Sequence, residues 1–219
     1  MTLSDRWSRG ARRLGIASST AIFIVGILYV GVIALWLIVE GTPSAPIGDP
    51  YLIAMEVLTI VSAFALVGLV AAVWCFASPA HRLAALAALA AGTFAAVLTM
   101  AVHFVQLTAI RQLWRAGRLV DYRLVWPSPL FAVEYFAWDV LVGLTLLSMS
   151  VAIAGGPGTA GARRFLLIGG VLCLVGTAGP LSGRMSLQNI GLMGYAVLLP
   201  IASALTARLF RASPANAAA

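Results

Sequence analysis

The chain has 219 residues, of which 62% are hydrophobic and only 10% charged, and its mean hydropathy of +1.01 excludes a soluble domain of ordinary composition. The net charge of +7 does not predict a nucleic-acid partner, because the basic residues stand at the ends of apolar runs, where they orient helices and meet lipid headgroups. All of these basic residues are arginine, so the lack of lysine excludes a Schiff base with retinal or pyridoxal phosphate.

Apolar runs predict an all-α, polytopic membrane protein built as a six-helix transmembrane bundle. Each run is long enough to cross roughly 30 Å of hydrocarbon. The predicted spans are residues 17–39, 51–76, 83–110, 131–154, 165–181 and 190–210. We expect a basic cytoplasmic N-terminus at 1–16, the transmembrane domain at 17–210 and a short cytoplasmic tail at 211–219. The first run lacks a small-residue cleavage site, so we interpret it as an uncleaved span.

Proline marks the predicted starts of three helices. In each case a side chain able to cap a helix precedes a proline, which suits the first helical position. These pairs are Asp49-Pro50, Ser78-Pro79 and Ser128-Pro129. They predict the starts of the second, third and fourth helices.

The third helix is predicted to extend beyond the bilayer as far as Gly117. Arg111, Arg115 and Arg118 recur at i, i+4 and i+7, a spacing that places them on one face of a helix. Gly117 is typical of a helix C-terminus. Because arginines are unexpected on the outer side, we expect at least one of them to reach an acid of the polar cluster described below.

The distribution of arginines predicts the orientation. One side of the membrane would receive nine of them: Arg6, Arg9, Arg12, Arg13, Arg82, Arg163, Arg164, Arg208 and Arg211. The other side would receive five: Arg111, Arg115, Arg118, Arg123 and Arg184. The positive-inside rule then places both termini in the cytoplasm.

Polar residues of several helices are predicted to lie in one leaflet. The second helix begins on the side where the third ends and the fourth begins, so these residues share a leaflet in either orientation. An ionisable residue at the centre of a span is penalised by roughly 2.5–3.5 kcal/mol on insertion scales, so such a cluster indicates mutual pairing or a function. The cluster comprises Glu56, His103, Gln106, Glu134 and Asp139, with Arg184 and Asn189 on the same side.

Helical spacing gives this cluster a direction. Glu56, Thr59 and Ser62 recur at helical spacing and form one polar stripe. Thr99, His103 and Gln106 form a second stripe on the next helix. We expect Glu56 and His103 to face each other across a pocket completed by Glu134 or Asp139, and at least one carboxyl to be protonated near neutral pH. These four are the candidate catalytic acid/base residues. The candidate substrate-binding residues are Gln106, Arg111, Tyr135, Trp138 and Asn189.

Aromatic residues surround the cluster in the sequence: Phe104, Trp126, Phe131, Tyr135, Phe136 and Trp138. One interpretation is a belt at the membrane interface, which we favour for Trp126. The other is an aromatic wall around an acid, an arrangement that suits an apolar substrate acquiring positive charge. The cluster also has ligand types that zinc or iron accept, but it lacks a diagnostic spacing, so no metal is predicted.

These observations favour an enzyme, such as an isomerase, cyclase or transferase, or a binding protein in the cytoplasmic membrane. Its expected partners are membrane lipid and an apolar, lipid-like or isoprenoid-like small molecule. Nucleic acid is not expected, a homo-oligomer is compatible with the chain, and no cofactor is identified. Two alternatives stay open. One is a proton- or ion-coupled transporter, which is disfavoured because the same helices carry no ionisable residue in the other leaflet. The other is a structural subunit whose polar cluster only fastens helices.

Overall fold

The computed structural model of the protein describes residues 7–40, 47–118, 126–155 and 158–215. Every secondary-structure element in these ranges is helical, in agreement with the predicted fold class. Arg6 and Arg123, which entered the count of arginines, lie outside the described residues, as does most of the loop after the first helix. The outermost parts of the predicted tails, 1–6 and 216–219, are also outside them.

Six helical stretches are long and apolar enough to cross a membrane within the described part of the chain. The first two are α1 (Arg9–Glu40) and α2 (Tyr51–Phe76). The third joins η2 (Pro79–His81), α3 (Arg82–Val105), η3 (Gln106–Ile110) and α4 (Arg111–Arg115). The fourth joins α5 (Pro129–Tyr135), η4 (Phe136–Val142) and α6 (Gly143–Ala152). The last two are α7 (Ala160–Gly176) with α8 (Ala178–Ser182), and η5 (Met185–Leu187), α9 (Gln188–Leu192), η6 (Met193–Leu198) and α10 (Leu199–Ala212).

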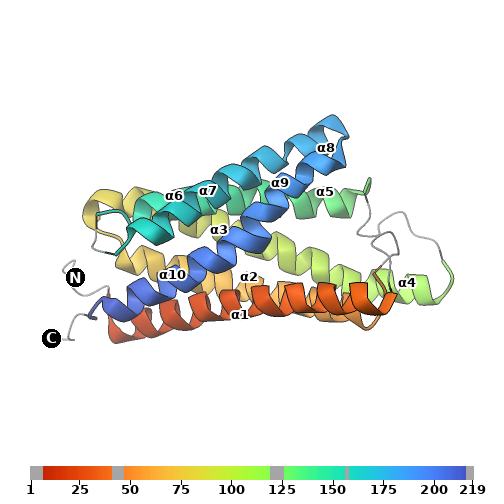
Figure 1. The fold of residues 1–219 in the computed structure, drawn as a ribbon, viewed down its shortest axis with the longest axis horizontal. Helices are drawn as coiled ribbons and strands as arrows, with labels where there is room; N and C mark the ends of the chain where they lie inside the picture. Colours follow the sequence, from red (N-terminus) through yellow and green to blue (C-terminus); the bar gives the residue numbers. More distant parts are fainter. Residues whose placement is uncertain (1–6, 41–46, 119–125, 156–157, 216–219) are drawn as a thin grey trace.

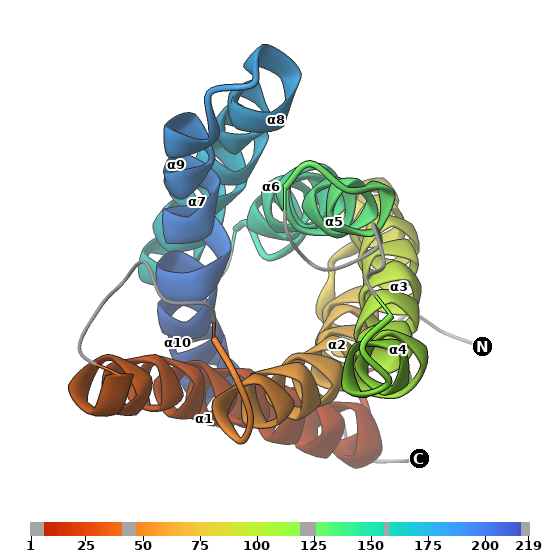
Figure 2. The same ribbon diagram turned by 90° about the vertical axis from the view of Figure 1, so that its right-hand side faces the viewer.

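The helices follow one another around a ring. α1 packs against α2, α2 against α3, α3 against α6 and α6 against α7. α7 then contacts α9 and η6, and α10 returns to α1, an order that the end-on view in Figure 2 makes visible. α1 begins and α10 ends at one end of the bundle, whereas α4 and α8 lie at the other (Figure 1). We call the latter the α4 end.

The predicted Ser-Pro helix starts are both found, but only one of the two serines makes a capping hydrogen bond. Ser128 Oγ accepts the backbone N–H of Phe131 at 3.2 Å, and Pro129 stands in the first turn of α5. Ser78 precedes η2, but its hydroxyl bonds Nδ1 of His81 at 3.0 Å and makes no capping bond to a backbone N–H. The predicted capping bond is therefore confirmed for Ser128 and wrong for Ser78.

The predicted cap at Asp49 is also wrong. α2 begins at Tyr51, its N-cap is Pro50, and no side chain caps it. The Asp49 carboxylate instead forms an ion pair with Arg111 at 2.6 Å. In this ion pair both partners carry a full charge, whereas a backbone N–H carries only a partial one, so the guanidinium is the stronger partner for the carboxylate.

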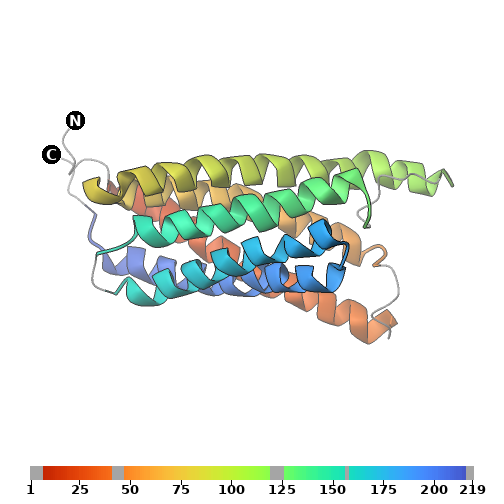
Figure 3. The same cartoon turned by 90° about the horizontal axis from the view of Figure 1, so that it is seen from above.

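The third stretch extends beyond its neighbours at the α4 end, as predicted (Figure 3). Gly117 adopts a left-handed φ of 68°, and the N–H of Arg118 bonds the carbonyl of Leu113 at 3.0 Å, which closes the helix in a Schellman-type turn. α4 itself ends at Arg115. Arg118 therefore lies past the helix end, and the prediction that it continues the face of Arg111 and Arg115 is wrong.

Apolar side chains fill the end of the bundle opposite α4. Trp7 packs its ring 5.0 Å from Phe76 and 5.0 Å from Phe210, and these two rings are 5.3 Å apart. Small residues such as Ala72 and Ala88 are fully buried between the helices, as the small-residue composition of these stretches predicts. This packing limits the cavity, which the next subsection describes, to the middle of the bundle and its α4 end.

Candidate functional site

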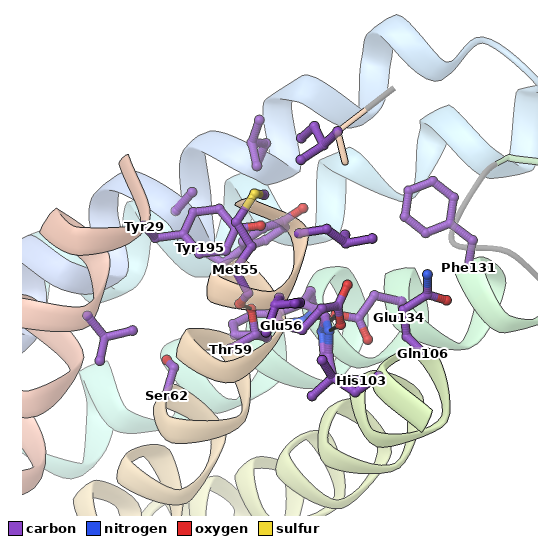
Figure 4. A pocket seen from close by; sticks show the side chains of 18 of the residues that line it. Tyr29, Met55, Glu56, Thr59, Ser62, His103, Gln106, Phe131, Glu134 and Tyr195 are labelled. Carbon is purple, nitrogen blue, oxygen red and sulfur yellow. Dashed lines mark hydrogen bonds and ion pairs between the residues drawn. The ribbon is translucent and has the colours of Figure 1, made fainter. Parts of the chain in front are cut away.

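Three ionisable side chains from three helical stretches meet near the α4 end. His103 on α3 contacts Glu56 on α2 through Nδ1 and Glu134 on α5 through Nε2, the second at 2.7 Å from Oε1. All three residues are buried. Figure 4 shows both carboxyl groups directed at the imidazole ring. The structure thus brings together the pair expected to face each other and selects Glu134 as its third member. We call these three residues the Glu–His–Glu cluster.

The indole of Trp138 adds a fixed donor to this cluster. Trp138 Nε1 donates to Glu134 Oε1 at 2.5 Å, so this oxygen contacts both the indole and His103. Trp138 follows Glu134 by four residues, about one helical turn, so the two side chains are neighbours on the same helical stretch. The other oxygen of the group, Glu134 Oε2, is buried and has no hydrogen-bond partner.

The cluster lies in the wall of a cavity of about 650 Å³. Its lining is drawn from α1, α2, the third and fourth stretches and the last stretch, so almost the whole ring of helices contributes. The polar stripe of Glu56, Thr59 and Ser62 faces the cavity, as do His103 and Gln106. The aromatic members of the wall are Tyr29, Trp114, Phe131, Tyr135, Trp138 and Tyr195.

The predicted aromatic residues divide between the cavity and the outside. Phe131, Tyr135 and Trp138 line the cavity, whereas Phe104 and Phe136 have exposed fractions of 62% and 50% and face outward. Outward aromatic rings at this end of the helices fit the predicted belt. The sequence alone could not make this division.

Three π-helical segments border the cavity. η3 supplies Gln106 and Ile110, η4 supplies Trp138, and η6 supplies Tyr195 to the lining. A π-turn holds one residue more than an α-turn, so it rotates the side chains that follow and frees backbone groups, and such turns are frequent at functional sites. No pattern in the sequence indicated these segments.

An ion pair stands beside the cavity at the α4 end. Arg111 binds Asp49 at 2.6 Å, and Arg115 lies 3.8 Å from the same carboxylate with 64% of its side chain exposed. Arg111 lines the cavity, as proposed for a substrate-binding residue. The prediction that an arginine reaches Glu56, Glu134 or Asp139 is wrong, since its acid is Asp49.

Asp139 does not join the Glu–His–Glu cluster. Its side chain is 0% exposed and lies where α7 and α9 approach each other, against Gly191 and near Gly176. Neither carboxylate oxygen has a hydrogen-bond partner at normal geometry, although the Gln188 side chain is close enough to interact with it. Asp139 follows Glu134 by five residues and is directed away from the cavity lining. We therefore remove it from the candidate catalytic group.

Asn189 is exposed and does not line the cavity, which corrects its predicted role. The preceding residue, Gln188, is buried and donates from Nε2 to the hydroxyl of Tyr195 at 2.9 Å. The spacing of seven residues between Gln188 and Tyr195 is a sign that could have identified this pair, because it puts them on one helical face. Tyr29 of α1 also points into the cavity and carried no such sign (Figure 4).

Hydrogen bonding fixes the proton count of the cluster. Each of the two contacts between an imidazole nitrogen and a carboxylate oxygen needs one hydrogen, so two protons are shared among Glu56, His103 and Glu134. Whether both sit on the ring or one sits on a carboxyl group, the net charge is then negative by one unit. A third proton would neutralise the cluster.

The same geometry argues against a shared metal ion. The two carboxyl groups contact opposite nitrogens of the His103 ring, so they do not converge with it on a single point. Among the described residues, no group of three histidine, cysteine or acidic side chains is placed to hold a metal ion.

Comparison with protein-family models, curated proteins and solved structures found no match to this chain. Its function must therefore be argued from the site.

Proposed function

We propose that the protein is a multi-pass membrane protein that binds a lipid-like or isoprenoid-like small molecule in the cavity at the α4 end and performs acid/base chemistry on it. Six apolar helices support the membrane location. The observation that carries the proposal is the Glu–His–Glu cluster in the wall of an aromatic-lined cavity of about 650 Å³. A cavity of this size accommodates a small amphipathic molecule.

The chemistry is a proton addition and a proton removal. A protonated carboxyl of the cluster adds its proton to a double bond of the ligand, and the ionised carboxyl removes a proton from a neighbouring carbon. His103 contacts both Glu56 and Glu134, so it can return the proton and restore the starting state. The result is an isomerisation or a cyclisation, which consumes no co-reactant. The aromatic rings stabilise the cation formed between the two steps.

A second candidate function is proton-coupled transport, which the shared protons of the cluster favour. A carrier needs a route through both halves of the membrane. Here the half opposite α4 is packed with buried apolar residues, among them the contacting rings of Trp7, Phe76 and Phe210. We therefore rank transport below chemistry on a ligand that reaches the cavity from one leaflet.

Filling the cavity tests the binding part of the proposal. Ala196 lines the cavity, whereas Ala109 is exposed on η3, so Ala196→Phe and Ala109→Phe make the same change inside and outside. Native mass spectrometry of the purified proteins should detect a retained apolar molecule in the wild type and in Ala109→Phe but not in Ala196→Phe. Equal retention by both variants would contradict the proposal.

Removing one titrating group tests the chemistry. Glu56→Gln keeps the shape of the side chain, and Glu40→Gln at the exposed end of α1 is the matched control. Lipid extracts of membranes containing wild type or Glu40→Gln should hold a product that is missing with Glu56→Gln. Proteoliposomes with an imposed pH gradient provide the test of transport. Loss of thermal stability in Glu56→Gln, with unchanged extracts and no change in flux, would leave only helix fastening as the role of the cluster.

A further inference from the structure

We infer that the ligand of the cavity is an amphipathic cation whose ammonium group donates a hydrogen bond to Glu134 Oε2. This inference rests on the proposed function and names the class of molecule that the same cavity binds. It follows from the charges in the lining, from an acceptor without a partner and from the placement of aromatic rings.

The charges that face the cavity do not cancel. Besides tyrosine hydroxyls, the ionisable groups among the described lining residues are Asp49, Glu56, His103, Arg111 and Glu134. Arg111 is paired with Asp49 at 2.6 Å, so these two contribute no net charge. The Glu–His–Glu cluster carries one negative charge when both of its hydrogen bonds are formed. In an apolar cavity this charge is costly unless a cation or a third proton accompanies it.

One acceptor of the cluster is unused. Glu134 is buried, its Oε1 contacts both His103 and Trp138, and its Oε2 has no hydrogen-bond partner. Gln106, which lines the same cavity, also has a buried side-chain oxygen without a partner. Buried acceptors are nearly always satisfied in native proteins. An N–H donor carried by the ligand would satisfy Glu134 Oε2 and supply the missing positive charge.

Aromatic rings are placed where they can hold the rest of such a molecule. In the cavity lining, Trp138 and Tyr195 have ring centroids 5.2 Å apart, and Phe131 and Tyr135 have ring centroids 4.4 Å apart. Ring faces attract a cation and also pack against an apolar body. A neutral lipid tail would gain the apolar contacts only, so the complete set of features favours a protonated amine with an apolar body.

Isosteric ligands separate the charge from the shape. Adamantylamine is a protonated amine on a rigid apolar cage, and methyladamantane is its neutral isostere. We would measure the binding of each to the purified protein in lipid nanodiscs, using thermal unfolding and tryptophan fluorescence. The wild type should bind adamantylamine at least about tenfold more tightly, because a charge-assisted bond and a cation–π contact are gained. In Glu134→Gln the preference should fall close to one, while methyladamantane binds as before. Glu40→Gln should retain the wild-type preference.

The outcomes distinguish this inference from the proposed function. Equal binding of both ligands by the wild type would overturn the inference and leave an apolar binding cavity standing. A preference for the amine that survives in Glu134→Gln would also overturn the inference, because a group other than Glu134 would then bind the ammonium. If neither ligand binds, the cavity does not take apolar molecules and the proposed function falls as well. The wild-type comparison decides the inference even if Glu134→Gln fails to fold.

Discussion

His103 Nε2 lies 2.7 Å from Oε1 of Glu134, although the two residues are 31 positions apart in the chain and belong to different helical stretches. The opposite nitrogen of the same ring contacts Glu56. One imidazole therefore joins the second, third and fourth stretches at the depth of the cavity. A single side chain that contacts two buried acids is expected to contribute to the stability of the bundle as well as to any chemistry.

We expect His103→Phe to lower the free energy of unfolding by about 2–4 kcal/mol, because it keeps a ring but leaves two buried carboxyl groups without their partner. Trp138→Phe removes only one donor from Glu134, which keeps its contact with His103, so its cost should be about 1 kcal/mol. Denaturant unfolding in mixed micelles measures both values. Equal stabilities of the two variants would show that the imidazole contacts do not hold the helices together.

The ion pair between Arg111 and Asp49 should be worth about 1 kcal/mol. Its side chains are only 22% and 27% exposed and 2.6 Å apart, so it is less screened than a pair on an open surface. A double-mutant cycle of Asp49→Asn and Arg111→Gln measures the coupling, since Arg115 at 3.8 Å stays in both backgrounds. The coupling should shrink in high salt. A coupling of zero at low salt would contradict this prediction.

Gly176→Ala should lower the free energy of unfolding by about 1–3 kcal/mol through overpacking. A Cβ at this position would lie 2.5 Å from Cα of Gly191, which is backbone and cannot turn aside. Gly31 of α1 has no atom within 4 Å of its own Cβ position, so Gly31→Ala is the control for the same change. We expect the control to be neutral or slightly stabilising. Thermal unfolding of both variants decides, and an equal loss in both would reject tight packing between α7 and α9 as the cause.

Reporter fusions test the orientation. The arginine count of nine to five predicts that both termini are cytoplasmic and that the loop at 42–48 is external. A reporter active only in the cytoplasm should therefore be active when fused after Ala219 and inactive within 42–48. The opposite pattern would place the cavity in the cytoplasmic leaflet, with the same lining residues and the same proposed ligand.

The sequence was sufficient for the six helical stretches and their approximate bounds, and for the depth of the polar residues. Apolar runs of spanning length produce helices whatever their neighbours are, because in hydrocarbon each backbone polar group must be paired within its own segment. Glu56 and His103 could be placed at one depth because depth depends only on helix direction and residue number. Ser128 could be assigned as a cap because a capping bond is local to the chain.

The tertiary structure alone decided which polar residues share a site. Asp139 and Glu134 looked equivalent in the sequence, but the approach of α7 and α9 takes Asp139 away from the cavity, and Trp138 and His103 hold Glu134 in its wall. The π-turns in η3, η4 and η6 shift the helical faces in ways that a regular period cannot predict. The Asp49-Pro50 pair predicts a helix cap, but the Asp49 carboxylate instead pairs with Arg111, which lies 62 residues further along the chain. Spacing along a helix fixes the direction of a side chain relative to its own axis, and only the packing of whole helices determines what that side chain meets.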